Sequence, residues 1–211
     1  MGRFCFPTII FYDQYQKGDL ISKTPFSKVH ICNNTSETQN TDELVVKIQK
    51  PYLNKNNIKN EIKILKLLSE SKYTPQLVYD EYHYLHCFLV FKKIPGKTLL
   101  EYSKNQSTQG IQPYIKEECV HQLLEGFKYL QKHGIIHRDI KNDNIMIRVD
   151  GEQVLLKIID FGLSRYQQNL KDFTTNEICG AYPYMCPEML SNRYYNGNCD
   201  TWSLGVLIYF I

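Results

Sequence analysis

Residues 134–144 read G-I-I-H-R-D-I-K-N-D-N, a segment that places two acids, two cations and two amides between apolar runs. A further acid, Asp160, lies in the run I-D-F-G, sixteen residues after Asn144. Transfer of a terminal phosphate depends on positioning and on stabilising negative charge, with a divalent metal held by hard oxygen ligands. Asp139 can accept a hydrogen bond from an attacking hydroxyl, and Lys141 can neutralise the transferring phosphate. Asn144 and Asp160 offer oxygens suited to Mg²⁺, so these residues predict a phosphoryl-transfer site.

The two segments resemble the catalytic loop, H-R-D-L-K-x-x-N, and the D-F-G motif of eukaryotic protein kinases. Lys141, two residues after Asp139, resembles the serine/threonine branch of that family. The resemblance implies an enzyme that transfers the γ-phosphate of ATP to a serine or threonine hydroxyl of a protein substrate, with ATP and Mg²⁺ as cofactors. It assigns the catalytic roles to Asp139, Lys141 and Asn144, and the metal to Asn144 and Asp160.

The resemblance extends over residues 15–211 and implies an α+β fold with a small β-rich N-lobe and a mainly helical C-lobe. We predict an N-lobe with a short N-terminal extension at residues 1–91, a hinge at 92–96 and a partial C-lobe at 97–211. The final run S-L-G-V-L-I-Y-F-I is strongly apolar and would be buried in a whole kinase. We therefore expect the C-lobe of this chain to be incomplete.

Composition narrows the class of protein. A chain of 211 residues, of which 43% are hydrophobic, can bury a core in one large domain or two small lobes. The net charge is only +3 with no dense basic block, which by itself argues neither for nor against nucleic acid. With the kinase resemblance, we expect a protein substrate and no nucleic-acid partner. Seven scattered cysteines without a C-x-x-C pair favour a cytoplasmic or nuclear location. Pro7 and Asp13 interrupt the apolar N-terminus, so we expect no membrane span, and the oligomeric state stays open.

The N-terminal part of the chain predicts strands. Residues 15–31 alternate enough to indicate two strands around a turn, and a further strand is expected at 43–48. By position, the segment from Ser22 to Val29 resembles the loop that covers ATP phosphates in kinases, and both residues are predicted to bind the nucleotide. The family's three glycines are replaced by Ser22, Thr24 and Ser27. Their side chains limit how closely backbone amides approach a phosphate.

Residues 44–47, L-V-V-K, resemble the V-A-I-K strand, which makes Lys47 the predicted cation for the α and β phosphates. Residues 56–68 predict an amphipathic helix. Its apolar residues at helical spacing are Ile58, Ile62, Leu65 and Leu68. Glu61 on this helix stands at the family's ion-pair position, and the alternative is an ordinary acid on a surface helix. Val45 replaces the usual small alanine and should crowd the adenine pocket.

Residues 79–91 predict a pair of strands, and the following K-K-I-P-G resembles the hinge between kinase lobes. Backbone groups of Lys92 and Ile94 would then bind adenine beside a bulky Phe91, although a buried strand end is an equal alternative. Met146 would lie beneath the adenine in the family's arrangement. A plain core methionine would look the same in the sequence.

The C-terminal part predicts a helix at 117–133 and a hairpin formed by strands at 145–149 and 154–159, joined by D-G. His137 is expected to be a packing residue rather than a metal ligand or acid–base group. Asp200 opens a run that resembles the start of the helix that anchors the kinase C-lobe, with the aspartate bonding back to the catalytic loop.

Residues 163–185 occupy the place of the kinase activation loop. Glu177 falls where many kinases carry an activating phosphothreonine. We hypothesise that Glu177 pairs with Arg138 and partly substitutes for that phosphate, although one carboxylate carries less charge. Thr174 and Thr175 are alternative phosphorylation sites.

Ala181 replaces the threonine that normally braces the catalytic aspartate and lysine. With the replaced loop glycines and the apparent truncation, it supports an alternative function as a pseudokinase, a nucleotide-binding or empty scaffold that acts through protein partners. Against this, every charged catalytic position is filled. A third alternative, a small-molecule phosphotransferase of kinase-like fold, is disfavoured by Arg138 and by the M-C-P-E segment.

Overall fold

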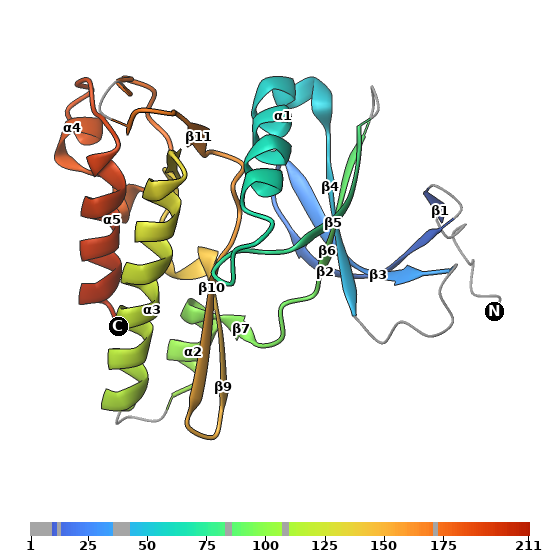
Figure 1. Cartoon of the computed structure of the whole chain (residues 1–211), viewed down its shortest axis with the longest axis horizontal. Coiled ribbons are helices and arrows are strands. Elements are labelled where there is room, and N and C mark those ends of the chain that lie inside the picture. The colour runs from blue at the N-terminus through green and yellow to red at the C-terminus, as the bar shows by residue number, and fades with distance from the viewer. Residues whose placement is uncertain (1–9, 12–13, 36–42, 83–85, 107–109, 171–172) are drawn as a thin grey trace. The chain divides into compact units, whose positions relative to one another are not determined.

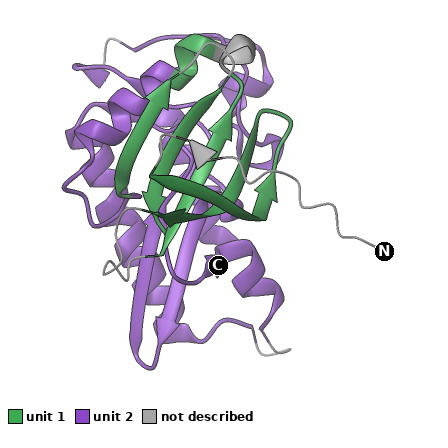
Figure 2. Cartoon of the chain, turned by 90° about the vertical axis from the view of Figure 1, so that its right-hand side faces the viewer, with its two compact units in different colours: residues 1–58, 76–93 green, residues 59–75, 94–211 purple. Residues whose placement is uncertain are grey.

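The computed structural model describes residues 10–11, 14–35, 43–82, 86–106, 110–170 and 173–211. Its contacts divide the chain into two compact units, shown in Figure 2. Unit 1 comprises Met1–Ile58 and Gln76–Lys93, and unit 2 comprises Lys59–Pro75 and Ile94–Ile211. Residues 59–75, which the sequence placed in the N-lobe, are therefore grouped with unit 2. The mixed α+β architecture of a kinase-like domain is confirmed.

Unit 1 is built around one antiparallel sheet with the strand order β1-β2-β3-β4-β6-β5 (Figure 1). The strands are β1 (Ile10–Phe11), β2 (Tyr15–Lys23), β3 (Ser27–Asn34), β4 (Leu44–Gln49), β5 (Leu77–Tyr82) and β6 (Cys87–Lys92). Each strand that the alternation of residue types predicted is present, and β2 and β3 form the expected pair around a turn.

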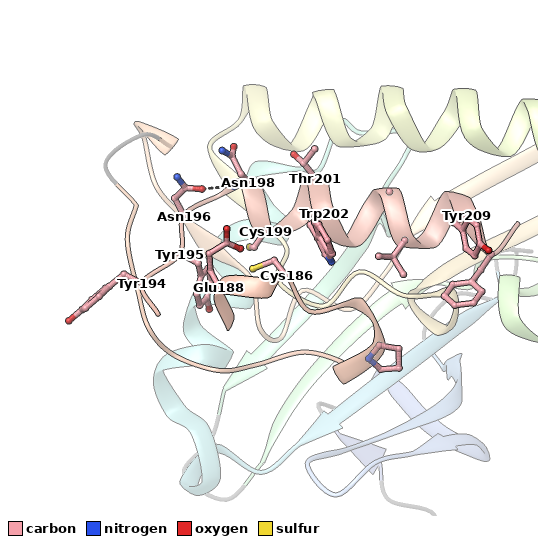
Figure 3. Close-up of a pocket in the computed structure, with 14 residues that line it drawn as sticks. Cys186, Glu188, Tyr194, Tyr195, Asn196, Asn198, Cys199, Thr201, Trp202 and Tyr209 are labelled. Carbon is pink, nitrogen blue, oxygen red and sulfur yellow. Dashed lines mark hydrogen bonds between the residues drawn. The ribbon is translucent and has the colours of Figure 1, made fainter. Parts of the chain in front are cut away.

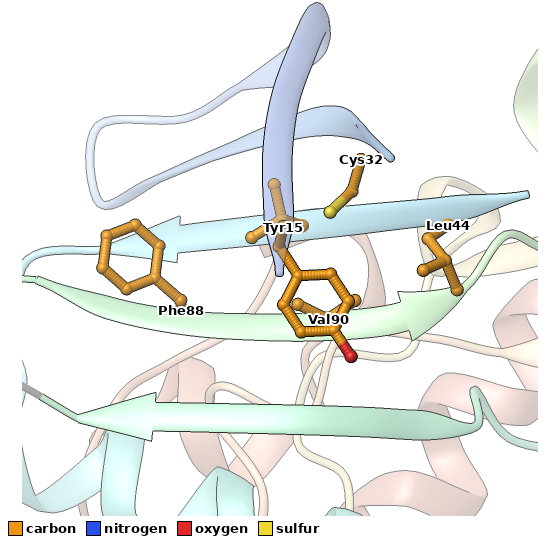
Figure 4. Packing of buried hydrophobic residues seen from close by; sticks show 6 residues of the cluster. Tyr15, Cys32, Leu44, Phe88 and Val90 are labelled. Carbon is orange, nitrogen blue, oxygen red and sulfur yellow. The ribbon is translucent and has the colours of Figure 1, made fainter. Parts of the chain in front are cut away.

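A small apolar cluster holds this sheet together (Figure 4). Its buried members are Tyr15, Cys32, Leu44, Val46, Phe88 and Val90. Successive side chains of a strand point to opposite faces. Burial of Leu44 and Val46 in this cluster therefore places Val45 and Lys47 on the other face of β4, where both are half-buried. The alternation separates the core residues of β4 from its predicted nucleotide-binding residues.

Helix α1 (Pro51–Leu67) begins before the predicted residue 56, because a proline at the first helical position needs no partner for a backbone N–H. Ile58, Leu65 and Leu68 of the predicted apolar stripe are buried and Ile62 is partly buried. Ile64, which the stripe did not include, is fully buried. Glu61 is only 2% exposed. Burial on this face contradicts the alternative that Glu61 is an ordinary surface acid.

Unit 2 combines helices with small sheets (Figure 1). Its helices are α2 (Leu99–Lys104), α3 (Pro113–Lys132), α4 (Pro187–Leu190) and α5 (Asn198–Tyr209). Its strands are β7 (Lys97–Thr98), β8 (Ile135–Ile136), β9 (Ile145–Asp150), β10 (Gln153–Ile158) and β11 (Arg165–Tyr166). None of the helices that the structure describes is long and apolar enough to cross a bilayer.

Helix α3 packs against the β9–β10 hairpin, and the catalytic loop lies between these two elements in the sequence. The hairpin was predicted, and Gly151 turns the chain with a φ of 59°, which favours glycine. Gln122 on α3 donates to the carbonyl of Val154 at 2.6 Å and accepts from the N–H of Leu156 at 2.9 Å, which fastens the helix to β10. Helix α3 ends before Gly134, whose φ of 69° suits a helix C-terminus.

Candidate active site

The catalytic loop begins directly after β8, which pairs with β11. Asp200, at the start of α5, accepts the N–H of His137 at 2.6 Å and that of Arg138 at 2.8 Å. Arg138 has a φ of 66°, a left-handed conformation that is rare outside glycine. The two N–H bonds of one buried carboxylate hold this unusual backbone in place. The sequence-based prediction that Asp200 bonds back to the catalytic loop is confirmed.

Three predicted catalytic side chains meet at one carboxylate. Asp139 Oδ2 accepts from Lys141 Nζ and from Asn144 Nδ2, each at 2.8 Å. Asn144 Nδ2 also donates to the carbonyl of Asp139 at 2.8 Å. The Asp139 side chain is only 10% exposed, and its second oxygen, Oδ1, is buried with no hydrogen-bond partner. The carboxylate is thus fixed by a cation and an amide, and its Oδ1 can still accept a hydrogen bond.

The predicted metal ligands lie on adjoining segments. The N–H of Ile159 donates to the carbonyl of Asn144 at 2.8 Å, which places Asp160 beside the end of the catalytic loop. Asp160 is exposed and has a φ of 64°. Because Nδ2 of Asn144 is committed to Asp139, its amide oxygen is directed away from that residue. One carboxylate and one amide oxygen are hard donors, so these residues fit Mg²⁺.

His137 behaves as the packing residue that the sequence predicted. It is fully buried, and its ring lies 5.0 Å from that of Phe161 in an edge-on contact. Its Nε2 lies 3.1 Å from the carbonyl of Ile159, and its Nδ1 accepts the N–H of Asp139 at 3.3 Å. Both ring nitrogens are occupied inside the protein, which leaves no nitrogen for a metal or for proton transfer.

A cluster of two arginines and a glutamate ties the activation-loop segment to the catalytic loop. Arg138 Nη1 lies 2.8 Å from Glu177 Oε2, as hypothesised from the sequence, and Arg165 Nη2 lies 3.1 Å from the same oxygen. Tyr195 donates its hydroxyl to the carbonyl of Glu177 at 2.5 Å. The backbones of Thr175 and Tyr195 also exchange two hydrogen bonds. Residues 175–177 are therefore held by charge and by backbone pairing together.

The electrostatics of this cluster favour an ionised glutamate. Partial burial raises the pKa of Glu177, but hydrogen bonds and charges from Arg138 and Arg165 outweigh it and hold the pKa below its ordinary value. Two arginines face one glutamate, so the cluster retains positive charge that one carboxylate does not neutralise, and Arg138 Nη2 is buried with no partner. Sequence motifs did not predict that Arg165 and Tyr195 belong to this cluster. For Arg165, the pairing of β8 with β11 provides the signal, because it sets Arg165 opposite Ile136.

Gly180 brings the next segment against the catalytic loop. It has a φ of 91°, and a Cβ there would lie 2.5 Å from the carbonyl oxygen of Arg138 and 3.6 Å from Asp139 Oδ1. Only glycine fits so close an approach. The following residue, Ala181, carries no hydroxyl that could reach the unpartnered oxygen of Asp139.

The predicted nucleotide-binding residues are divided between the two units. In unit 1, Ser22 and Val29 are cross-strand partners on β2 and β3, with Ser22 exposed and Val29 half-buried. Lys92 is exposed and donates its N–H to the carbonyl of Gln76 at 3.1 Å, so that N–H is already engaged within unit 1. In unit 2, Ile94 and Met146 are half-buried and Glu61 is buried. The Lys47–Glu61 pair stays a prediction.

A separate groove of about 1130 Å³ runs along α5 (Figure 3). Its aromatic lining residues are Tyr194, Tyr195, Trp202, Tyr209 and Phe210. No residue predicted to act in catalysis or nucleotide binding is among those that line it. The groove reaches the catalytic loop only through Tyr195, whose hydroxyl lies 3.4 Å from Arg138 Nη1, as far as the described residues show.

Comparison with known proteins identifies the family. The family model described as Protein kinase domain matches residues 15–211. The chain belongs to the protein kinase family. Curated relatives of this kinase domain include Sperm motility kinase 2B of Mus musculus, which is 38% identical over 129 residues, 59% of this chain and 24% of that protein.

Two further relatives cover nearly the whole kinase domain. Ribosomal protein S6 kinase alpha-4 of Homo sapiens is 27% identical over 95% of this chain and 26% of that protein. Probable serine/threonine-protein kinase 2 of Plasmodium falciparum (isolate K1 / Thailand) is 28% identical over 98% of this chain and 39% of that protein. The chain thus spans about a quarter to two fifths of the length of these relatives.

Proposed function

We propose that this kinase domain is an active protein serine/threonine kinase that uses ATP and Mg²⁺. The observation that carries the proposal is the Asp139 carboxylate, which Lys141 and Asn144 hold at 2.8 Å each in a nearly buried site. Such a fixed acid, with a cation beside it, suits the alignment of a hydroxyl for phosphoryl transfer. Lys141 and the serine/threonine kinase among the relatives support the choice of hydroxyl class.

Each side chain has a distinct task in this proposal. Asp139 accepts a hydrogen bond from the substrate hydroxyl and aims the oxygen, and Lys141 balances negative charge on the phosphate. Asn144 and Asp160 hold the magnesium ion through their side-chain oxygens. Bound Mg-ATP supplies the phosphate that is transferred. Asp200 acts indirectly, because its two N–H bonds keep Arg138 and hence Asp139 in position.

The nucleotide-binding residues follow the family pattern. The residues assigned to this task are Ser22, Val29, Val45, Lys47, Glu61, Lys92, Ile94 and Met146. The face of β4 opposite the core carries Val45 and Lys47, as adenine and phosphate contacts require. Protein substrates fit the family, and the cysteine pattern favours a cytoplasmic or nuclear location.

The test is mass-spectrometric detection of phosphate transferred from Mg-ATP to the chain itself and to a mixed peptide pool. We expect phosphoserine or phosphothreonine from the wild type and none from Asp139→Asn. Asp143→Asn, which changes an exposed acid of the same loop, is the matched control and should retain transfer. Transfer that survives Asp139→Asn would contradict the assignment of the catalytic acid.

A non-catalytic scaffold is the second candidate, because the Asp139 carboxylate lacks the hydroxyl partner that the family pattern places beside it. Asp139 Oδ1 has no hydrogen-bond partner, and Ala181 offers no hydroxyl to it. A wild-type chain that unfolds cooperatively and binds Mg-ATP but transfers no phosphate would favour the scaffold. Transfer to sugars or antibiotics but not to peptides would instead favour a small-molecule phosphotransferase.

A further inference from the structure

The turn between β2 and β3 is closed by its own side chains. Thr24 Oγ1 accepts the N–H of Ser27 at 3.0 Å and that of Phe26 at 3.3 Å. The N–H of Thr24 donates to the carbonyl of Ser27 at 2.9 Å. The hydroxyls of Thr24 and Ser27 lie 3.0 Å apart and share a further hydrogen bond. A threonine that accepts the amide two residues on is a local turn motif of this residue type.

Every backbone donor of this four-residue turn is therefore in use. Pro25 has no N–H, and the remaining N–H groups, those of Thr24, Phe26 and Ser27, are bonded within the turn. Backbone N–H groups of a glycine-rich turn bind phosphate oxygens only when they point outward and lack internal acceptors. The turn occupies the position of the phosphate-covering loop, but as it stands its amides do not fit a phosphate.

We propose that Thr24 sets the nucleotide affinity of this kinase domain by competing with phosphate for the amides of Phe26 and Ser27. The proposal rests on the proposed function, because it assumes that Mg-ATP binds. The wild type would then bind ATP with little help from this turn. The gain in affinity from adenosine to ATP would therefore be smaller in the wild type than in a chain whose turn amides are free. Removal of the Thr24 hydroxyl would free both amides.

The test compares Thr24→Val, which keeps the branched shape and loses the hydroxyl, with Thr24→Ser, which keeps the hydroxyl. Thr24 is exposed, so neither change disturbs the core. Isothermal titration calorimetry would measure the dissociation constants of Mg-ATP and adenosine for each chain. A net hydrogen bond changes an equilibrium by about 2- to 10-fold, so we expect Mg-ATP to bind Thr24→Val tighter by about that factor. Adenosine should bind all three chains equally.

A second readout follows the amides themselves. On addition of Mg-ADP, the amide resonances of Phe26 and Ser27 should move in Thr24→Val and stay nearly unchanged in the wild type and in Thr24→Ser. Equal Mg-ATP affinity in all chains, or weaker binding by Thr24→Val, would overturn the competition. Absence of Mg-ATP and adenosine binding from every chain would instead refute the proposed function, and the competition with it.

Discussion

Glu177→Gln tests whether a fixed carboxylate holds the activation-loop segment. The Arg138 side chain is fully buried, whereas that of Glu177 is 49% exposed. Without the carboxylate, Arg138 keeps the carbonyl of Leu163 at 2.8 Å and the Tyr195 hydroxyl at 3.4 Å, while its Nη2 still has no partner. Breaking a fully buried ion pair costs about 3–5 kcal/mol, and an exposed pair contributes about 0–1 kcal/mol. We expect an intermediate loss of about 1–3 kcal/mol, because water reaches Glu177 but not Arg138.

The assay is urea unfolding followed by the fluorescence of Trp202, the only tryptophan in the chain. Glu125→Gln is the matched control, because Glu125 is 40% exposed and pairs with the exposed Lys128 at 3.1 Å. It should change the free energy of unfolding by no more than about 0.5 kcal/mol. Equal effects of the two substitutions would refute the argument that burial of Arg138 makes the Glu177 pair important.

Peptide phosphorylation provides the functional arm of the same experiment. If Glu177 substitutes for a phosphate, Glu177→Gln should lower kcat, and Thr175→Ala should leave most of the activity intact. Thr175 Oγ1 accepts the N–H of Glu177 at 3.1 Å, so a modest loss is expected from that change alone. Full activity in Glu177→Gln together with no activity in Thr175→Ala would show that phosphorylation, rather than the carboxylate, orders the segment.

The remaining predictions concern pH and the catalytic loop. The folded-state pKa of Glu177 is lowered. Its ionised carboxylate therefore stabilises the folded state fully above the unfolded pKa of about 4.3, and this stabilisation is lost as the pH falls through the folded pKa. Glu177→Gln should abolish this part of the acid dependence, which urea unfolding at successive pH values would measure. Asp200→Ala should destabilise by about 2–6 kcal/mol in urea unfolding, because two buried N–H groups lose their acceptor at about 1–3 kcal/mol each; a loss below about 1 kcal/mol would contradict this. Ala181→Thr should raise the rate of peptide phosphorylation by about 2- to 10-fold if its hydroxyl reaches Asp139, whereas Ala181→Val should not.

Local spacing explains why much of the catalytic site could be predicted. Asp139, Lys141 and Asn144 lie within one short loop, so their contacts depend on few backbone angles. Strands β2, β3 and β4 were equally accessible, because alternating residue types indicate which face is buried, whereas β1 was not predicted. Arg165 was missed because it reaches Glu177 only through the pairing of β11 with β8, which no short motif records.

Helix boundaries and turn chemistry were harder to predict from the sequence. Apolar periodicity predicted most of α1 and α3, but both helices begin earlier, at Pro51 and Pro113, where a proline suits the first helical position. The replaced glycines of the β2–β3 turn were visible in the sequence. That the Thr24 hydroxyl takes the amides of Phe26 and Ser27 depends on the folded shape of the turn.

The departures from the family pattern affect different steps. Thr24 occupies backbone donors that would contact a nucleotide, and Ala181 leaves an acceptor on Asp139 without a partner, so these two residues bear on nucleotide affinity and on the transfer rate respectively. Glu177 should instead favour activity, because its carboxylate provides a negative charge beside Arg138 without any modification. For the proposed serine/threonine kinase, this combination predicts an activation segment that is ordered without phosphorylation and a rate that is limited at the active site. Such an enzyme would gain more from Ala181→Thr than from phosphorylation of Thr175, and measuring both changes on one peptide substrate distinguishes the two limits.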